Sequence, residues 1–212
     1  PGPISSQTEQ DTRNFGRYAR IPVLDPKSPE EAYIMVQDAF RLSEKLGTPV
    51  ILRPTTRVCH SCASIEVQDI LNPQRENQFE KDPHWVIFPR LSYNSKIKLI
   101  SREKSLSDEL SDYKFNEIIN FVSGKVSCGK TDPCRVGIAC GGVSSAYTFE
   151  AIEELELSCP VLNVATPYPF PDKLAERFLT GLDKVIVFEE LDPVIEDALL
   201  MLCGRLGLKV QI

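Results

Sequence analysis

The sequence has no apolar run long enough to cross a membrane and no excess of basic residues. A membrane-spanning helix needs about 20 consecutive apolar residues, and the beginning of the chain has neither the charged start nor the apolar core of a secretory signal. Lys and Arg number 24 against 30 Asp and Glu, which gives a net charge of -6. Proteins that bind the phosphate backbone need clustered cations. We therefore expect a cytoplasmic protein whose partners include no nucleic acid and no membrane.

The chain also lacks an initiator methionine. It begins with Pro1-Gly2-Pro3, in what the composition indicates is a loop. We therefore expect an internal fragment of a larger protein. The composition, 42% hydrophobic and 25% charged over 212 residues, is typical of folded globular chains.

The chain also lacks the even number of cysteines that a disulfide framework needs, because it has seven. An odd number without an export signal does not favour a disulfide framework. Cys59 and Cys62 form a CxxC pair, but Cys128 and Cys134 are too far apart to complete a tight structural zinc site. A redox dithiol would need its CxxC at a helix N-terminus. We expect unlinked thiols and no metal site, and a role for the CxxC stays open.

The residues from Arg135 onward repeat a strand-helix unit. The predicted order is strand 135–142, helix 144–156, strand 160–165, helix 171–180, strand 184–190, a helix from residue 192, and strand 209–212. The strands are apolar runs rather than alternating ones, which is typical of strands buried on both faces. The sequence therefore predicts an α/β fold with a doubly wound parallel sheet in this part.

Three-residue spacing of apolar side chains predicts which helix faces are buried. Helix 144–156 should begin at Ser144 or Ser145 as its N-cap. The predicted buried face of this helix is Ala146, Phe149, Ile152 and Leu155, and that of the last helix is Ile195, Leu199, Leu202 and Leu206. Cys140 and Cys203 fall in the same apolar pattern.

The N-terminal part contains only half of another α/β unit. Residues 1–19 are polar and turn-rich, and we expect a loop there. A strand at 20–26 leads to a helix that starts with the capping box Ser28-Pro29-Glu30-Glu31 and runs to Gly47, and strand 48–54 follows. The inward positions of this helix should be Ala32, Met35, Val36, Ala39, Leu42 and Leu46. Two strands cannot form a stable sheet of their own.

Residues 63–133 read as a connector with structure of its own. Their only strand-like stretch is HWVIFPR, and a charged segment at 97–122 suggests one or two helices.

Two features at predicted strand ends favour ordinary structural roles over chemistry. Gly141-Gly142 lacks the further glycines or the lysine of a nucleotide-binding loop, so a tight turn explains it. Glu189, Glu190 and Asp192 could form a general base or a metal pair. With no histidine nearby, helix capping by Asp192 and surface charge is the simpler interpretation.

The motifs become specific when they are taken together. In chain order they are PGPISSQTEQDTR, PVLDPKSPEEA, TPVILRPTTRVCHS, FEKDP, GIACGGVSSAY, PYPFP and VFEELDP. This series closely resembles the α subunits of indolepyruvate:ferredoxin oxidoreductases, which are thiamine diphosphate and iron-sulfur enzymes of anaerobes. The likeness covers nearly the whole chain and is strongest over residues 5–13 and 24–61.

The resemblance implies three parts. Residues 1–64 would be the C-terminal part of a pyrimidine-binding thiamine domain, 65–133 a mixed connector, and 134–212 a domain similar to the transketolase C-terminal domain. The parent enzyme would use thiamine diphosphate, Mg and [4Fe-4S] clusters. The family's activating glutamate, its GDG motif and its cluster cysteines do not occur in this sequence. We therefore expect that the fragment alone binds none of these cofactors and is inactive.

The resemblance also implies a reaction and its partners. The parent would oxidatively decarboxylate arylpyruvates to aryl-acetyl-CoA and reduce ferredoxin, together with a β subunit, and its small-molecule partners would be the 2-oxoacid and coenzyme A. Gln10, Asp11 and Arg13 would lie near thiamine and substrate. Arg57 and His60 would contact the substrate carboxylate or a coenzyme A phosphate. No catalytic residue is expected in the fragment.

Two alternatives remain open at this point. The parent could act on another 2-oxoacid, such as 2-oxoglutarate or a branched-chain acid. The chain could also be a non-enzymatic flavodoxin-like module that docks a partner. The oligomeric state is open too.

Overall fold

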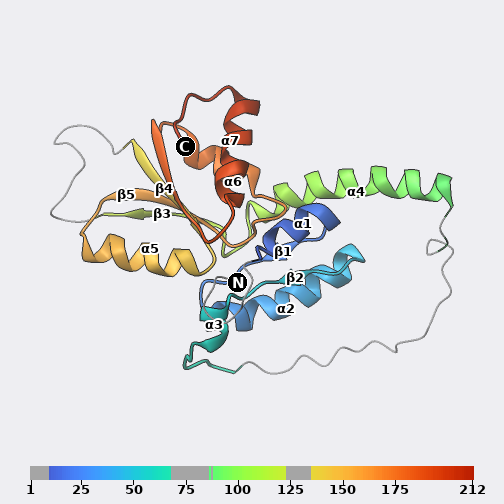
Figure 1. Cartoon of the computed structure of the whole chain (residues 1–212), viewed down its shortest axis with the longest axis horizontal. Coiled ribbons are helices and arrows are strands. Elements are labelled where there is room, and N and C mark those ends of the chain that lie inside the picture. The colour runs from blue at the N-terminus through green and yellow to red at the C-terminus, as the bar shows by residue number, and fades with distance from the viewer. Residues whose placement is uncertain (1–9, 68–85, 87, 123–134) are drawn as a thin grey trace.

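The computed structural model describes residues 10–67, 86, 88–122 and 135–212. These residues form a four-stranded sheet, a two-stranded sheet and seven helices (Figure 1). The helices are α1 (Arg13–Ala19), α2 (Pro29–Leu46), α3 (Thr56–His60), α4 (Pro89–Leu110), α5 (Val143–Glu154), α6 (Asp172–Leu179) and α7 (Val194–Leu206). The strands are β1 (Val23–Leu24), β2 (Ile51–Leu52), β3 (Glu117–Phe121), β4 (Val136–Gly141), β5 (Cys159–Val164) and β6 (Lys184–Phe188).

The four-stranded sheet has the strand order β3-β5-β4-β6. The predicted α/β architecture is confirmed for β4, β5 and β6, which are parallel. The prediction of a purely parallel sheet was wrong, because β3 lies antiparallel to β5 and the sheet is therefore mixed. This strand comes from the charged segment that was expected to be helical, where five residues are too few to show a strand period. The predicted strand 209–212 is reduced to one bridge, between Lys184 and Gln211.

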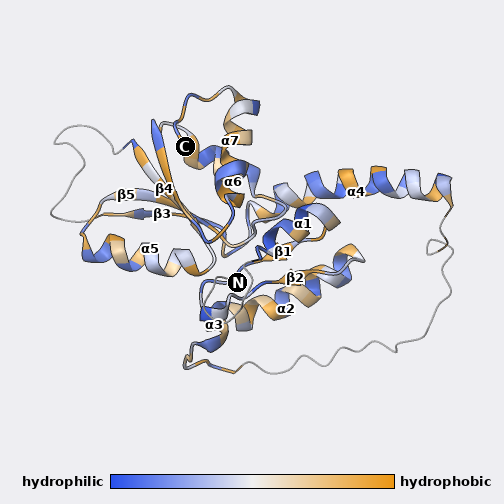
Figure 2. Ribbon diagram, in the orientation of Figure 1, coloured by the Kyte–Doolittle hydropathy of each residue, from blue (hydrophilic) through white to orange (hydrophobic). Residues whose placement is uncertain are grey.

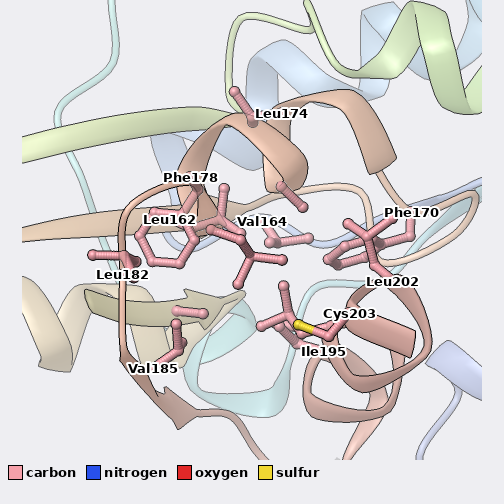
Figure 3. Close-up of a cluster of buried hydrophobic side chains, with 14 residues drawn as sticks. Leu162, Val164, Phe170, Leu174, Phe178, Leu182, Val185, Ile195, Leu202 and Cys203 are labelled. Carbon is pink, nitrogen blue, oxygen red and sulfur yellow. The ribbon is translucent and has the colours of Figure 1, made fainter. Parts of the chain in front are cut away.

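Helices cover both faces of this sheet, as predicted. One face packs Ala139, Leu162 and Val164 against α6 and α7, and Figure 3 shows the side chains of this cluster pointing toward one another. The opposite face packs Cys140 and Val161 against α5. Cys140 and Cys203 are buried, as the apolar pattern predicted.

The buried face of α5 differs from the prediction. Its buried residues are Val143, Ser145, Thr148 and Ile152. Ala146 is exposed, and Leu155 is 64% exposed. Polar bonding explains the rotation, because the Ser145 hydroxyl donates to Asn163 Oδ1 at 2.6 Å inside the protein. The N-cap is Gly142, which is two residues before Ser144 and three before Ser145.

The last helix follows its prediction more closely. Ile195, Leu199 and Leu202 are buried on α7. Leu206 is 42% exposed, contrary to the prediction, because the helix ends there and Gly207 takes a left-handed conformation.

The N-terminal unit has the predicted strand, helix and strand. The serine half of the predicted capping box of α2 is present, since the Glu31 backbone N–H donates to Ser28 Oγ at 3.3 Å. The Glu31 carboxylate accepts instead from the Lys27 backbone N–H, at 2.8 Å. Met35 and Ala39 are buried, whereas Val36 is exposed and was wrongly placed. The loop predicted for residues 1–19 was wrong over α1, a helix of two turns that is too short to show a period.

The two sheets are joined directly through the loop after β5. The Val23 backbone N–H donates to the Tyr168 carbonyl at 2.7 Å, and the Asp25 N–H donates to the Ala165 carbonyl at 2.8 Å. Leu24, Met35 and Ala39 form one apolar cluster with Ala165. A sheet of two strands is marginally stable by itself. The β1-β2 sheet therefore gains stability from its contacts with the larger sheet.

Helix α4 projects away from both sheets (Figure 1). Its buried residues, Leu106, Ser107 and Leu110, lie in its last turns, where the Ser107 hydroxyl donates to the Phe170 carbonyl at 2.5 Å. Figure 2 shows hydrophilic and hydrophobic residues mixed along this helix. In the described part of the chain, no helix combines the length and the apolar character needed to span a membrane. Three of the seven residues of the predicted strand HWVIFPR, at positions 84, 85 and 87, lie outside the described residues, and its last two residues begin α4.

Candidate functional site

The carboxyl ends of strands from both sheets converge at one place. Asp25 follows β1, Arg53 follows β2, and Glu189 and Glu190 follow β6. In parallel α/β sheets this edge is where ligands bind. Six ionisable side chains meet here, and we call them the charge cluster: Asp11, Arg13, Asp25, Arg53, Glu189 and Glu190.

Arg13 lies at the centre of the charge cluster and is 1% exposed. Its Nε donates to Asp11 Oδ1 at 3.0 Å, and its Nη2 donates to Asp11 Oδ2 at 2.5 Å. Its Nη1 donates to Glu189 Oε2 at 2.8 Å. Nη2 also donates to the carbonyls of Glu190 and, at 2.8 Å, Asp192. The guanidinium is therefore surrounded by acceptors belonging to the protein.

Glu189 has a second set of partners at the start of α7. Its carboxylate accepts hydrogen bonds from the backbone N–H groups of Val194 at 3.1 Å, Ile195 at 2.9 Å and Glu196 at 3.0 Å. These are among the N–H groups that a helix leaves unpaired, and the helix dipole favours a negative charge there. Capping was expected from Asp192, with Glu189 as a surface charge. The structure assigns the cap to Glu189, whose side chain is 8% exposed.

Asp25 and Arg53 form the buried pair behind this contact. Arg53 Nη1 donates to both carboxylate oxygens of Asp25 at 3.2 Å. Burial raises the pKa of Asp25 to about 6, although the charges of Arg53 and Arg13 oppose the rise. The pKa of Asp11 is lowered instead. Burial favours a higher pKa there as well, but the hydrogen bonds and the charge of Arg13 outweigh burial.

Gly142 makes the close approach to Asp25 possible. A Cβ at this position would lie 2.7 Å from Asp25 Oδ2, and the backbone φ is +54°. Only glycine adopts this conformation readily. The glycine pair is thus the tight turn that was predicted, and its second residue also leaves room for a buried carboxylate.

The charge cluster has more negative than positive groups. Four carboxylates face two guanidinium groups, and the N-terminus of α7 supplies further positive potential beside Glu189. Two buried atoms in it, Arg53 Nη2 and Glu190 Oε2, have no hydrogen-bond partner and lie 3.8 Å apart. Burial is the main cause of the raised pKa of Asp25, and the charge of Glu190 makes a smaller contribution in the same direction.

The other predicted site residues lie on the exposed side of the N-terminal unit. Gln10, Arg57 and His60 are all exposed. Arg57 lies on α3, where its Nη1 donates to the Tyr147 hydroxyl at 3.1 Å and its guanidinium lies 5.6 Å from the Tyr147 ring centre. Tyr147 belongs to α5, so this contact also joins the two parts of the chain.

The structure thus divides the predicted site residues into two groups. It brings Asp11 and Arg13 together in the charge cluster, and it leaves Gln10, Arg57 and His60 accessible. Sequence reasoning missed Asp25 and Arg53. Their position could have been noticed, because each is a charged residue between an apolar strand and a proline.

The cysteines and carboxylates of the described residues form no group of three or more His, Cys, Asp or Glu arranged to hold a metal ion. Cys59 and Cys62 are free and exposed. Cys59 lies in the last turn of α3, not at a helix N-terminus. Cys128 and Cys134 lie outside the described residues.

Curated proteins similar to this chain share one name, indolepyruvate oxidoreductase subunit IorA. The chain is 36% identical to that subunit from Methanothermobacter thermautotrophicus over 213 aligned residues, which cover 100% of the chain and 33% of the relative. It is 38% identical to the subunit from Archaeoglobus fulgidus, over 92% of the chain and 30% of the relative. The chain therefore spans about a third of the length of the curated relatives it matches. No family model matches the chain.

A solved structure supports the fold independently. The 2-oxoglutarate:ferredoxin oxidoreductase from Magnetococcus marinus, with 2-oxoglutarate, coenzyme A and succinyl-CoA bound, aligns with a TM-score of 0.53. The alignment covers 91% of this chain and 38% of that one at 17% identity. At this identity the likeness concerns the fold: an α/β arrangement that matches part of such an enzyme. Together with the sequence identities, it shows that the chain is homologous to IorA, the α subunit of indolepyruvate oxidoreductase.

Proposed function

We propose that this chain is part of an enzyme that oxidatively decarboxylates arylpyruvates, indolepyruvate above all, to aryl-acetyl-CoA while reducing ferredoxin. The observation that carries the proposal is the identity of 36% with an IorA subunit along the whole chain. The parent protein would work as an α subunit with a β subunit in the cytoplasm, and its cofactors would be thiamine diphosphate, Mg and [4Fe-4S] clusters.

The described residues do not form a complete site for these cofactors. The carboxylates of Asp11, Asp25 and Glu189 are engaged by Arg13, Arg53 and the start of α7, and the described residues hold no metal-binding group of three or more His, Cys, Asp or Glu. We propose that parts of the parent outside this chain hold the diphosphate and the clusters, and that the isolated chain is inactive.

We further propose how the five predicted site residues contribute. Gln10, Arg57 and His60 have exposed side chains that can meet substrate, cofactor or coenzyme A directly. A guanidinium held over an aromatic ring, as Arg57 is over Tyr147, keeps donors free for a carboxylate or a phosphate. Asp11 and Arg13 are buried, and they would act through the position of the segment that carries Gln10.

The second candidate is the same reaction on another 2-oxoacid. The solved structure that matches this fold is of an enzyme named for 2-oxoglutarate. The described residues do not identify a substrate pocket, so the preference for an aromatic side chain rests on sequence identity alone.

The test is an assay of the complete parent assembled with its β subunit under anaerobic conditions. Ferredoxin reduction is followed with indolepyruvate, phenylpyruvate, 2-oxoglutarate, pyruvate and a branched-chain 2-oxoacid, with coenzyme A and thiamine diphosphate present. We expect the highest kcat/KM with indolepyruvate. Preference for 2-oxoglutarate would select the second candidate, and no turnover of any 2-oxoacid would reject the proposal in favour of a partner-docking module.

A further inference from the structure

Residues 10–13 are fixed by a part of the chain that lies far away in sequence. Arg13 donates to the Glu189 carboxylate, at a separation of 176 residues, and to the carbonyls of Glu190 and Asp192. In return, the Asp192 backbone N–H donates to Asp11 Oδ2 at 3.2 Å. The side chain of Asn14, the second residue of α1, donates to the Asp192 carboxylate at 2.6 Å. The turn between β6 and α7 therefore holds this segment at several points.

Glu189 transmits the position of α7 to Arg13. One of its carboxylate oxygens, Oε2, accepts from the N–H groups of Val194 and Ile195 and also from Arg13 Nη1. A carboxylate held by helix N–H groups has little freedom to follow a moving arginine. A rigid planar guanidinium likewise fits one arrangement of its acceptors. The Arg13–Glu189 pair is thus a fixed joint between the N-terminal segment that carries Arg13 and the start of α7.

We propose that Arg13 and Glu189 act together as positioning residues, which hold residues 10–12 at the carboxyl edge of the sheets so that Gln10 meets the ligand. This inference rests on the proposed function, since the position of Gln10 matters only if the parent binds a ligand there. In this role Arg13 does not touch substrate, because its guanidinium is occupied by Asp11, Glu189 and two carbonyls.

The experiment compares four variants of the complete parent enzyme assembled with its β subunit. They are Arg13→Lys, Glu189→Gln, the double variant, and Arg135→Gln as a matched control. Arg135 pairs with Asp183 at 2.7 Å, and both are exposed at the opposite edge of the same sheet. Two readouts are needed: kcat and KM for the 2-oxoacid, and amide hydrogen exchange of the segment 10–16, which reports local opening.

We expect Arg13→Lys and Glu189→Gln each to lower kcat/KM at least tenfold and to speed exchange of the segment at least fivefold. The double variant should be no more than threefold worse than the poorer single variant, because residues that act as a unit are not additive. Arg135→Gln should stay within twofold of wild type in both readouts.

Three results would overturn the proposal. Arg13→Lys could raise KM for the 2-oxoacid while Glu189→Gln leaves both readouts within twofold, which would mean that Arg13 binds substrate itself. Faster exchange with unchanged kcat and KM would leave the pair as a structural joint without effect on the site. Unchanged exchange in both variants would show that the pair does not hold the segment. If wild type turns over no 2-oxoacid, the proposed function fails, and the exchange readout still decides whether the pair fixes residues 10–12.

Discussion

The charge cluster and the exposed face of α3 place arginines of the same chemistry in opposite settings. Arg13 is buried among carboxylates and carbonyls, whereas Arg57 lies at the surface beside one tyrosine. A buried charge that loses a partner is left uncompensated, but an exposed charge is solvated by water. The comparison separates residues that maintain the architecture from residues that are free to bind a ligand.

The largest effect is expected from Arg13→Met. Methionine keeps much of the side-chain volume but leaves Asp11 and Glu189 without their buried cation, so the free energy of unfolding should fall by about 3 to 5 kcal/mol. Urea denaturation of the protein measures this. Arg135→Met, at an exposed pair, should cost at most about 1 kcal/mol. Equal losses in the two variants would mean that burial does not set the strength of these pairs.

Gly142→Ala should come next. Its new Cβ would lie within 2.9 Å of Asp25 Cγ, and alanine must also adopt a φ of +54°. Overpacking and the left-handed backbone together predict a loss of about 2 to 4 kcal/mol in the free energy of unfolding. Gly204→Ala is the control, because a Cβ there meets nothing within 4 Å in a helix. That substitution should be neutral or should stabilise by up to about 1 kcal/mol.

The contribution of Asp25 to the free energy of unfolding should depend on pH, with a smaller effect than the two substitutions above. Its sign should be opposite to that of a carboxylate in a typical buried ion pair. Its folded pKa, about 6, is raised above the ordinary value of 3.8. The folded state therefore binds a proton more tightly, and this contribution is fully present below about pH 4 and is lost as pH rises through about 6. This rise in pKa limits the pH-dependent contribution of Asp25 to the free energy of unfolding to about 3 kcal/mol.

Asp25→Asn tests this sign, because asparagine keeps the shape and cannot ionise. Denaturation midpoints of wild type and variant should be compared from pH 4 to pH 7. We expect wild type to lose stability relative to the variant as pH rises across this window. A gain over the same window would mean that Asp25 is ionised in the folded state with a lowered pKa.

Arg57→Ala should have the smallest effect on stability. Its exposed contact with Tyr147 predicts a loss of less than about 1 kcal/mol in the free energy of unfolding. In the assembled parent enzyme the same variant should lower kcat/KM at least tenfold if Arg57 binds substrate or coenzyme A. Activity within twofold of wild type would remove Arg57 from the proposed site residues.

Sequence patterns predicted β4 and β5 well because these inner strands of the larger sheet are largely buried. Such strands are continuous apolar runs, and RVGIACGG is a clear example. KVIVFEE is an apolar run too, but β6 is an edge strand whose Ile186 and Phe188 are 40% and 47% exposed. The pattern failed where an element is short or polar. Helix α1 has two turns, and β3 is an edge strand within a charged segment. The buried face of α5 was misjudged because Ser145 and Thr148, which are polar, face inward and are hydrogen-bonded.

The candidate site was less predictable, because it is formed by contacts between distant residues. The resemblance selected Asp11 and Arg13, but nothing in the sequence indicates that Glu189 lies beside them. Asp25 and Arg53 fall at the ends of two predicted strands, and their pairing becomes evident only when β1 and β2 lie side by side. A charged residue placed between an apolar strand and a proline was the one available indication.

We propose that Arg13 and Glu189 form a single joint between the segment 10–14 and the start of α7. A double-mutant cycle measures this directly, with the free energy of unfolding determined for wild type, Arg13→Met, Glu189→Gln and the double variant. We predict a coupling of about 1.5 to 3 kcal/mol between the two substitutions, as expected for residues in one buried network. Losses that add to within about 0.5 kcal/mol would contradict the claim.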